Sequence, residues 1–137
     1  MKKTESAATR RKDAVKGTVR HIAFTMYPVK VMGRARRFYE DGLGLKLTNN
    51  FRDQWVEYHV GNGCFAVTTM AQDVAPSAHS GGSIAFEVDD VDAALAKLRA
   101  AGARVKLEPF STPVCRMAVV LDPEGNALTL HAKNPGR

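Results

Sequence analysis

The sequence has few of the residues that build disulfide scaffolds or zinc sites, and it lacks the long apolar runs of membrane spans. Its 2 cysteines, Cys64 and Cys115, are far apart and form no Cys-x-x-Cys motif. We therefore expect both to be reduced side chains in a cytoplasmic protein. No apolar run approaches the roughly 18 residues that a membrane span needs, and Met117 to Leu121 is among the longest. The N-terminal region also lacks the continuous apolar segment of a secretory signal.

Positive charge is distributed unevenly along the chain. The net charge is +6, and residues 1–17 supply +4 of it, from six basic and two acidic side chains. That segment has almost no apolar periodicity, so we expect a disordered basic tail ahead of the fold. Most tails of this composition are solvated rather than bound to polyanions, and we do not expect nucleic acid as a partner.

The rest of the chain contains an internal repeat. His21-Ile22-Ala23-Phe24 and Ser83-Ile84-Ala85-Phe86 each lead into a helical pattern, which a Lys-Leu pair follows at Lys46-Leu47 and at Lys106-Leu107. A duplication of this kind predicts two similar structural units. The copies differ at their first position, where His21 corresponds to Ser83.

Alternation and helical spacing predict the elements of the first copy. These are a strand at 19–27, a helix at 29–43 and strands at 45–48, 55–60 and 64–70. Pro28 is expected to end the first strand, Asn49-Asn50 to break away from the second, and Gly61-Asn62-Gly63 to form a hairpin turn. Within the first strand, His21, Ala23 and Thr25 are expected to share one face.

The second copy follows a Pro-, Ser- and Gly-containing linker at 71–82. Its predicted elements are a strand at 83–88, a helix from a cap at Asp89 or Asp90 to a stop at Gly102, and strands at 105–107, 114–121 and 127–131. Pro109 and Pro113 are expected to mark a loop. The predicted fold is α+β, a single domain at 18–132 built from two β-α-β-β-β modules (18–70 and 83–132), with a C-terminal tail at 133–137.

Three motifs indicate a family when they are read in order. They are Phe38-Tyr39 before Leu43-Gly44-Leu45, the run from Ala85 to Asp90, and Asp122-Pro123-Glu124-Gly125-Asn126. Together they resemble the vicinal oxygen chelate family, which includes glyoxalase I, extradiol ring-cleaving dioxygenases, fosfomycin-resistance transferases and bleomycin-binding proteins. The resemblance covers about residues 18–132. It implies that the sheets of the two modules form a U-shaped trough.

In the metalloenzymes of that family, His and carboxylate side chains hold a divalent ion in the trough. Carried over one at a time, three ligand positions fall on His21, Ser83 and Thr129, and a fourth, on the strand at 64–70, has no acid or histidine. Hydroxyl groups bind such ions poorly. The resemblance therefore implies a degenerate member without a metal in the usual site. A two-histidine, one-carboxylate set of His21 and His131 with Glu57 or Glu87 is the alternative.

Strand parity predicts a small-molecule pocket on the trough face, of mixed aromatic, apolar and hydrogen-bonding character. The residues expected to line it are His21, Thr25, Trp55, Glu57, His59, Ser83, Glu87, Met117, Thr129 and His131. Trp55 is expected either to stack on a flat ligand or simply to pack. Each histidine has the alternative of being an ordinary polar residue on a half-exposed strand.

These observations predict a metal-free homodimer that binds a small molecule, as the antibiotic-sequestering members of the family do. The alternative is a metal-dependent lyase, isomerase or dioxygenase with one divalent ion and an unusual ligand set. A third interpretation is a structural or regulatory domain that binds a protein partner. The sequence does not distinguish pairing of the modules within one chain from exchange between two chains.

Overall fold

Two four-stranded mixed sheets form the scaffold of the computed structural model, which describes residue 17 and residues 20–135. The tail predicted at 1–17 lies outside these residues except for Gly17. The first module consists of β1 (Thr25–Pro28), α2 (Met32–Arg36), η1 (Arg37–Gly42), β2 (Lys46–Phe51), β3 (Trp55–Val60) and β4 (Gly63–Thr68). The second consists of β5 (Ile84–Glu87), α3 (Val91–Ala100), β6 (Arg104–Ser111), β7 (Cys115–Leu121) and β8 (Ala127–Lys133). Two β-α-β-β-β modules are thereby confirmed.

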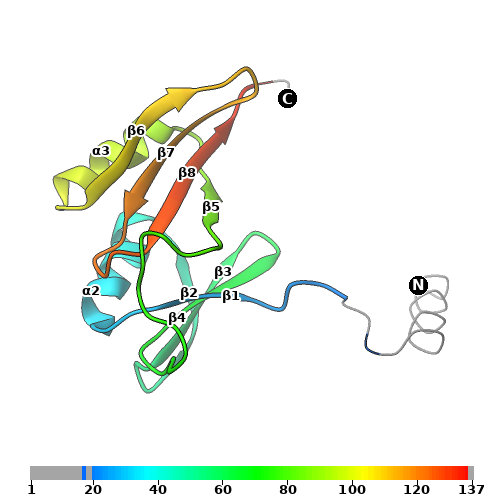
Figure 1. Ribbon diagram of the computed structural model, residues 1–137, viewed down its shortest axis with the longest axis vertical. Coiled ribbons are helices and arrows are strands. Elements are labelled where there is room, and N and C mark those ends of the chain that lie inside the picture. Colours follow the sequence, from blue (N-terminus) through cyan, green and yellow to red (C-terminus); the bar gives the residue numbers. More distant parts are fainter. Residues whose placement is uncertain (1–16, 18–19, 136–137) are drawn as a thin grey trace.

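The two sheets have the same strand order, as a duplication predicts. They run β1-β4-β3-β2 and β5-β8-β7-β6, with β1 parallel to β4 and β5 parallel to β8. Figure 1 shows the sheets at a steep angle, with α2 and α3 on the same side of the molecule and residues 20–24 leading away on the other. No helix in the described part is long and apolar enough to cross a membrane.

The first strand is shorter than predicted. β1 begins at Thr25, whereas residues 20–24 form irregular, exposed chain, and the strand ends at Pro28 as predicted. Thr25 pairs with Phe65, and in this register the residues before Ala23 extend beyond Gly63, the first residue of β4. They therefore have no partner strand there. Pro28 is tolerated because β1 is an edge strand.

The first helix also departs from the prediction of 29–43. It begins at Met32, and from Arg37 onward it is a π-helix. Two backbone amides just before the helix have partners outside it. The Val29 amide donates to the Thr68 carbonyl at 2.8 Å, and the Val31 amide donates to the Glu124 carboxylate at 2.6 Å.

The outer edge strands β2 and β6 are longer than predicted. Asn49-Asn50 does not break away, because β2 continues to Phe51, and Pro109 lies within β6 instead of marking a loop. Both strands contain register shifts where they pair with their neighbours. Edge strands tolerate bulges, polar residues and proline because one side of the strand makes no ladder hydrogen bonds.

The second helix agrees closely with its sequence signals. Asp90 caps α3 by accepting a hydrogen bond from the Ala93 amide at 3.0 Å. Gly102 follows the helix with a φ of +97°, in the left-handed region where glycine is favoured. The buried side of α3, formed by Val91, Leu95 and Leu98, packs on the second sheet.

One core joins the two modules. Phe65 of β4 contacts the edge or face of four other aromatic rings, and among them Phe86 of β5 belongs to the second module, at 5.4 Å between ring centroids. Leu128 and Leu130 on β8 are fully buried in the same cluster. The helix-covered side of each sheet thus faces the shared core, and the modules pack together within a single chain.

The turn between β7 and β8 forms hydrogen bonds that connect the two modules. The buried Asp122 carboxylate accepts a hydrogen bond from the Tyr39 hydroxyl at 2.7 Å, and the Asn126 side chain donates to the Pro28 carbonyl at 2.8 Å. Burial and the adjacent carboxylate raise the pKa of Tyr39 well above its usual range, so the phenol remains a donor. This family motif therefore has a structural role here.

Glu124 provides a third link between the modules. Its carboxylate accepts hydrogen bonds from the Val31 amide at 2.6 Å and from Arg34 at 3.3 Å, and its side chain is only 4% exposed. Burial alone would raise the pKa of Glu124, but these bonds and one from the Lys30 amide outweigh it, so that pKa is lower than usual. The charged carboxylate is the form that holds the first turn of α2.

Replacing Glu124 by glutamine is expected to lower the free energy of unfolding by about 1–2 kcal/mol at neutral pH. A carboxyl group whose pKa is lower in the folded state stabilises the protein above its unfolded pKa of about 4.3, and that contribution is lost as pH falls through the folded pKa. The difference between the wild type and the variant should therefore shrink towards about pH 3 in urea unfolding.

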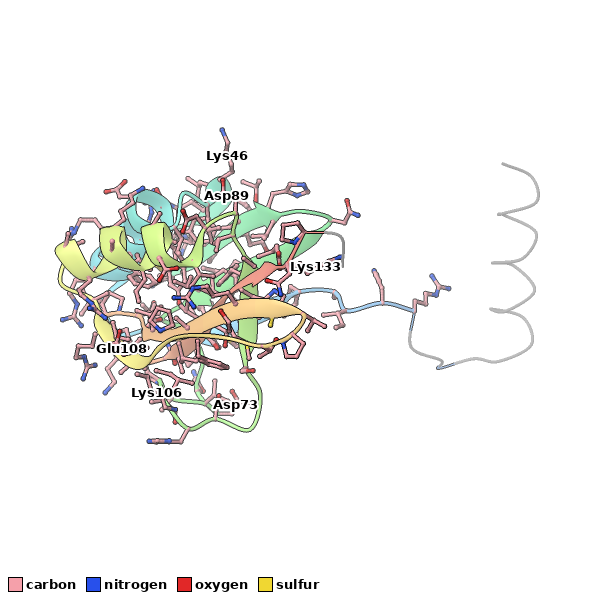
Figure 2. All side chains as sticks on the ribbon, turned by 90° about the horizontal axis from the view of Figure 1, so that it is seen from above. Lys46, Asp73, Asp89, Lys106, Glu108 and Lys133 are labelled. Carbon is pink, nitrogen blue, oxygen red and sulfur yellow. The ribbon has the colours of Figure 1, made fainter. Side chains whose placement is uncertain are left out.

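Glu108→Gln is the matched control for this experiment. Glu108 of β6, labelled in Figure 2, pairs with Arg99 at 2.8 Å, but its side chain is 69% exposed. Exposed pairs contribute less than about 1 kcal/mol. A Glu124→Gln effect that stays constant over the whole pH range would contradict the assignment.

Candidate functional site

The uncovered face of the first sheet presents three of the predicted pocket residues. Trp55, Glu57 and His59 alternate on β3 with the buried Val56 and Tyr58, as predicted. On β4 this face also includes Cys64, which pairs with His59. Burial and the nearby Glu57 carboxylate raise the pKa of the Cys64 thiol. The thiol is therefore protonated at neutral pH and is a poor nucleophile.

Trp55 is held in a defined orientation. Its indole N–H donates to the Glu57 carboxylate at 2.8 Å, and the ring of Phe24 meets it edge-on at 5.4 Å between centroids. Phe51 on β2 is its cross-strand partner. Phe24 and Phe51 are 46% and 48% exposed, so these three residues form an accessible aromatic surface, named here the aromatic face.

The sequence analysis did not identify Phe24 or Phe51 as pocket residues. Parity assigned Phe24 to the opposite face from the site, because the face of His21, Ala23 and Thr25 was taken as the pocket face. Phe51 was expected to lie in a loop. Only the pairing of β2 with β3 places Phe51 opposite Trp55. The available sequence signal was Phe51, an aromatic residue close to the sole tryptophan of the chain.

The uncovered face of the second sheet presents another four predicted residues: Glu87, Met117, Thr129 and His131. The Glu87 carboxylate lies 2.6 Å from His131 Nδ1 and accepts a hydrogen bond from the Lys133 amide at 2.9 Å. The Lys133 amide, followed by His131, lowers the pKa of Glu87. This pair is partly exposed and forms the most polar part of the second face.

The remaining three predicted residues do not join either group. His21 lies in the irregular segment before β1, and Ser83 precedes β5, both exposed. Thr25 pairs with Phe65, which puts it on the side of the sheet that faces the core, and Met26 instead pairs with Ala66 on the uncovered face. The expectation that His21 and Thr25 share a strand face with the site is therefore wrong, because β1 starts after His21 and its register with β4 puts Thr25 on the core side of the sheet.

The two groups remain apart within one chain. Among the described residues, no hydrogen bond or ion pair connects Trp55, Glu57 and His59 with the group around Glu87 and His131. The single lining that strand parity predicts is thus divided between two sheet faces of one chain. Both faces lie opposite the shared core.

The side chains at the family's ligand positions do not fit a divalent metal. Ser83 and Thr129 offer only neutral hydroxyl groups, and His21 is an isolated imidazole. Over residues 20–135, no three His, Cys, Asp or Glu side chains are grouped closely enough to hold one ion. The Glu87–His131 pair supplies at most two donors of different chemistry from one chain.

Sequence comparison defines the family. The model of the Glyoxalase/Bleomycin resistance protein/Dioxygenase superfamily matches residues 19–130, which span both modules. The chain belongs to this superfamily. The three motifs and the repeat thus led to the correct family. No curated protein sequence matches the chain significantly.

Several solved structures share this fold. Lactoylglutathione lyase from Agrobacterium tumefaciens is similar with a TM-score of 0.64 and 20% identity, over 83% of this chain and 94% of that one. A glyoxalase-related enzyme from Fulvimarina pelagi gives 0.72 and 17%, over 85% and 90%. The antibiotic binding protein TnmS3 from Streptomyces sp. CB03234 gives 0.70 and 24%, over 85% and 98%. Identities this low show the fold and leave the activity open.

Proposed function

We propose that this protein is a metal-free, cytoplasmic homodimer that binds a planar aromatic small molecule without transforming it. The aromatic face is the observation that supports this function. A tryptophan whose N–H is fixed by Glu57 at 2.8 Å offers a flat surface at little cost in side-chain entropy on binding. Antibiotic binding is recorded for one protein of the same fold, TnmS3.

A second copy of the chain would complete the trough. The uncovered face of the first sheet has an aromatic surface, and that of the second has the Glu87–His131 pair. Strands β1 and β5 each have one edge that no strand pairs with among residues 20–135. Pairing of these edges between two copies would bring the two kinds of face together and remove water from the aromatic surface, with twofold symmetry as in most homodimers.

In this proposal the protein has no resident metal because of the side chains at the family's ligand positions. Two of the family's ligand positions hold hydroxyl groups, and these ions prefer imidazole, thiolate or carboxylate. The second candidate is a metal-dependent lyase or dioxygenase, which the 2.6 Å contact between Glu87 and His131 favours. In a dimer this pair could face Glu57 or His59 of the other copy.

Three measurements on the full chain test the proposal. Elemental analysis of protein purified without chelators should give far less than one metal ion per chain, and sedimentation should give a dimer. Titration with aromatic antibiotics and with glutathione adducts should quench the fluorescence of Trp55 in a saturable manner for at least one compound. Stoichiometric Ni, Co, Mn, Fe or Zn that is lost in His131→Ala would instead establish the metalloenzyme.

Replacement of Trp55 by alanine is expected to weaken binding of the quenching compound by about thirtyfold, the loss typical of a central aromatic contact. Calorimetry is the suitable measurement because the variant has no tryptophan. Trp55→Phe should retain part of the affinity, since it keeps a ring but not the bond to Glu57. Val31→Ala, at an exposed position before α2, is the control. Unchanged affinity in Trp55→Ala would exclude the aromatic face as the binding site.

A further inference from the structure

A cavity lies away from both uncovered sheet faces, at the junction of the two modules. Its volume is about 620 Å³, within the range of about 300–1,000 Å³ that holds small molecules. The first module contributes Arg34 to Gly42 of α2 and η1, and the second contributes the end of α3, the start of β6 and the Asp122-Pro123 turn. None of the ten predicted pocket residues lines this junction cavity.

Basic side chains surround the junction cavity. Four line it, namely Arg34, Arg37, Lys97 and Arg104, against two carboxylates, Asp41 and Asp122. The Asp122 carboxylate is buried and already accepts four hydrogen bonds within the protein.

Three of the four cations are available to a ligand. Arg34 pairs with Glu124 at 3.3 Å, whereas Arg37, Lys97 and Arg104 have no ion-pair partner within residues 20–135. The position of Lys97 in the last turn of α3 accounts in part for its positive charge, because a cation is favourable at the negative end of a helix dipole. Arg37 and Arg104 come from other elements and have no such explanation. The electrostatic balance of the cavity is therefore positive.

The interior surface of the cavity is apolar. Phe38 and Leu98 are 9% and 1% exposed, and Leu121, Ala103 and Pro123 add further aliphatic surface. Gly42 allows η1 to approach α3, because a Cβ there would come within 2.8 Å of the Leu98 side chain. A flat apolar group can thus contact these side chains while an attached charged group contacts the arginines that also line the cavity.

We propose that the junction cavity binds an organic anion, an apolar or aromatic body that bears one or two carboxylate or phosphate groups. The guanidinium groups of Arg37 and Arg104 supply paired N–H donors suited to such oxyanions. The apolar interior accounts for a preference for organic anions over free phosphate. Since both modules line the cavity, a bound anion also bridges them and stabilises their packing.

The proposal is tested with naphthyl phosphate, naphthoate, uncharged naphthalenemethanol and inorganic phosphate, each titrated into the full chain. The two organic anions should bind saturably and raise the Tm, and the other two should bind at least tenfold more weakly. Amide NMR shifts on binding should cluster at residues 37–42 and 97–104. A difference between the two organic anions would show which oxyanion the site prefers.

Charge variants separate a specific site from general attraction to a basic protein. Arg37→Gln with Arg104→Gln should weaken naphthyl phosphate binding at least tenfold, as expected for loss of two charge-assisted contacts. Lys46→Gln with Lys133→Gln removes the same charge from exposed positions elsewhere (Figure 2) and should change the affinity less than twofold. Equal losses in both variants, shifts centred on residues 55–59, or no saturable binding would each overturn the proposal.

Discussion

Replacement of Asp122 by alanine is expected to lower the free energy of unfolding by about 3–5 kcal/mol, the range for breaking a buried charged network. Asp122 is 1% exposed, and its carboxylate accepts hydrogen bonds from the Tyr39 hydroxyl, two backbone amides and the Asn126 side chain at 2.7–3.0 Å. Alanine would leave these donors buried without an acceptor. Urea unfolding measures the loss.

Asp92→Ala is the control for this loss of a carboxylate. Asp92 makes two hydrogen bonds to Arg116, at 2.7 and 2.9 Å, but the pair is exposed to solvent. Its removal should therefore cost less than about 1 kcal/mol. A cycle with Tyr39→Phe should show coupling between Tyr39 and Asp122. If Asp122→Ala and Asp92→Ala lowered the free energy of unfolding equally little, the turn would not stabilise the packing of the modules.

Truncation of Phe65 to alanine is the second change with a large expected effect, a loss of about 3–5 kcal/mol in the free energy of unfolding. Phe65 is 2% exposed and contacts the rings of Tyr27, Tyr39, Tyr58 and Phe86, with centroids 5.0–6.3 Å away. Its removal leaves a cavity where the cores of the two modules meet. The loss therefore affects the packing between modules as well as the first sheet.

Phe51→Ala provides the comparison for Phe65. Phe51 is 48% exposed at the sheet edge, so truncation there should cost less than about 1 kcal/mol. Chemical denaturation followed by far-ultraviolet circular dichroism suits both variants. A single cooperative transition is expected because one core spans the modules. Two separate transitions in Phe65→Ala, with the second module unaffected, would contradict a shared core.

The two proposed ligand sites respond to different substitutions. Trp55→Ala acts on the aromatic face and should leave organic-anion binding in the junction cavity unchanged. The Arg37 and Arg104 substitutions act on the cavity, which contains no residue of the aromatic face. Failure of one proposal would therefore leave the other standing, and success of both would describe a protein that binds two chemically different small molecules.

The sequence by itself determined the repeat, the two modules and the local elements with strong periodic signals. The cap at Asp90, the stop at Gly102 and the alternation of Trp55, Glu57 and His59 all agree with the structure. These features depend on contacts within a few residues along the chain. Periods of 2 and about 3.6 residues therefore suffice to predict them.

Only the tertiary structure decided which strand ends pair and where the site residues lie. The residues before Ala23 extend beyond the start of β4, the Val31 amide is bound by Glu124 of the other module, and Phe51 faces Trp55 through strand pairing. The junction cavity likewise joins residues 34–42 with residues 97–104 and 121–123. Contacts between such distant segments leave no periodic signal in the chain, because they depend on how the two modules pack.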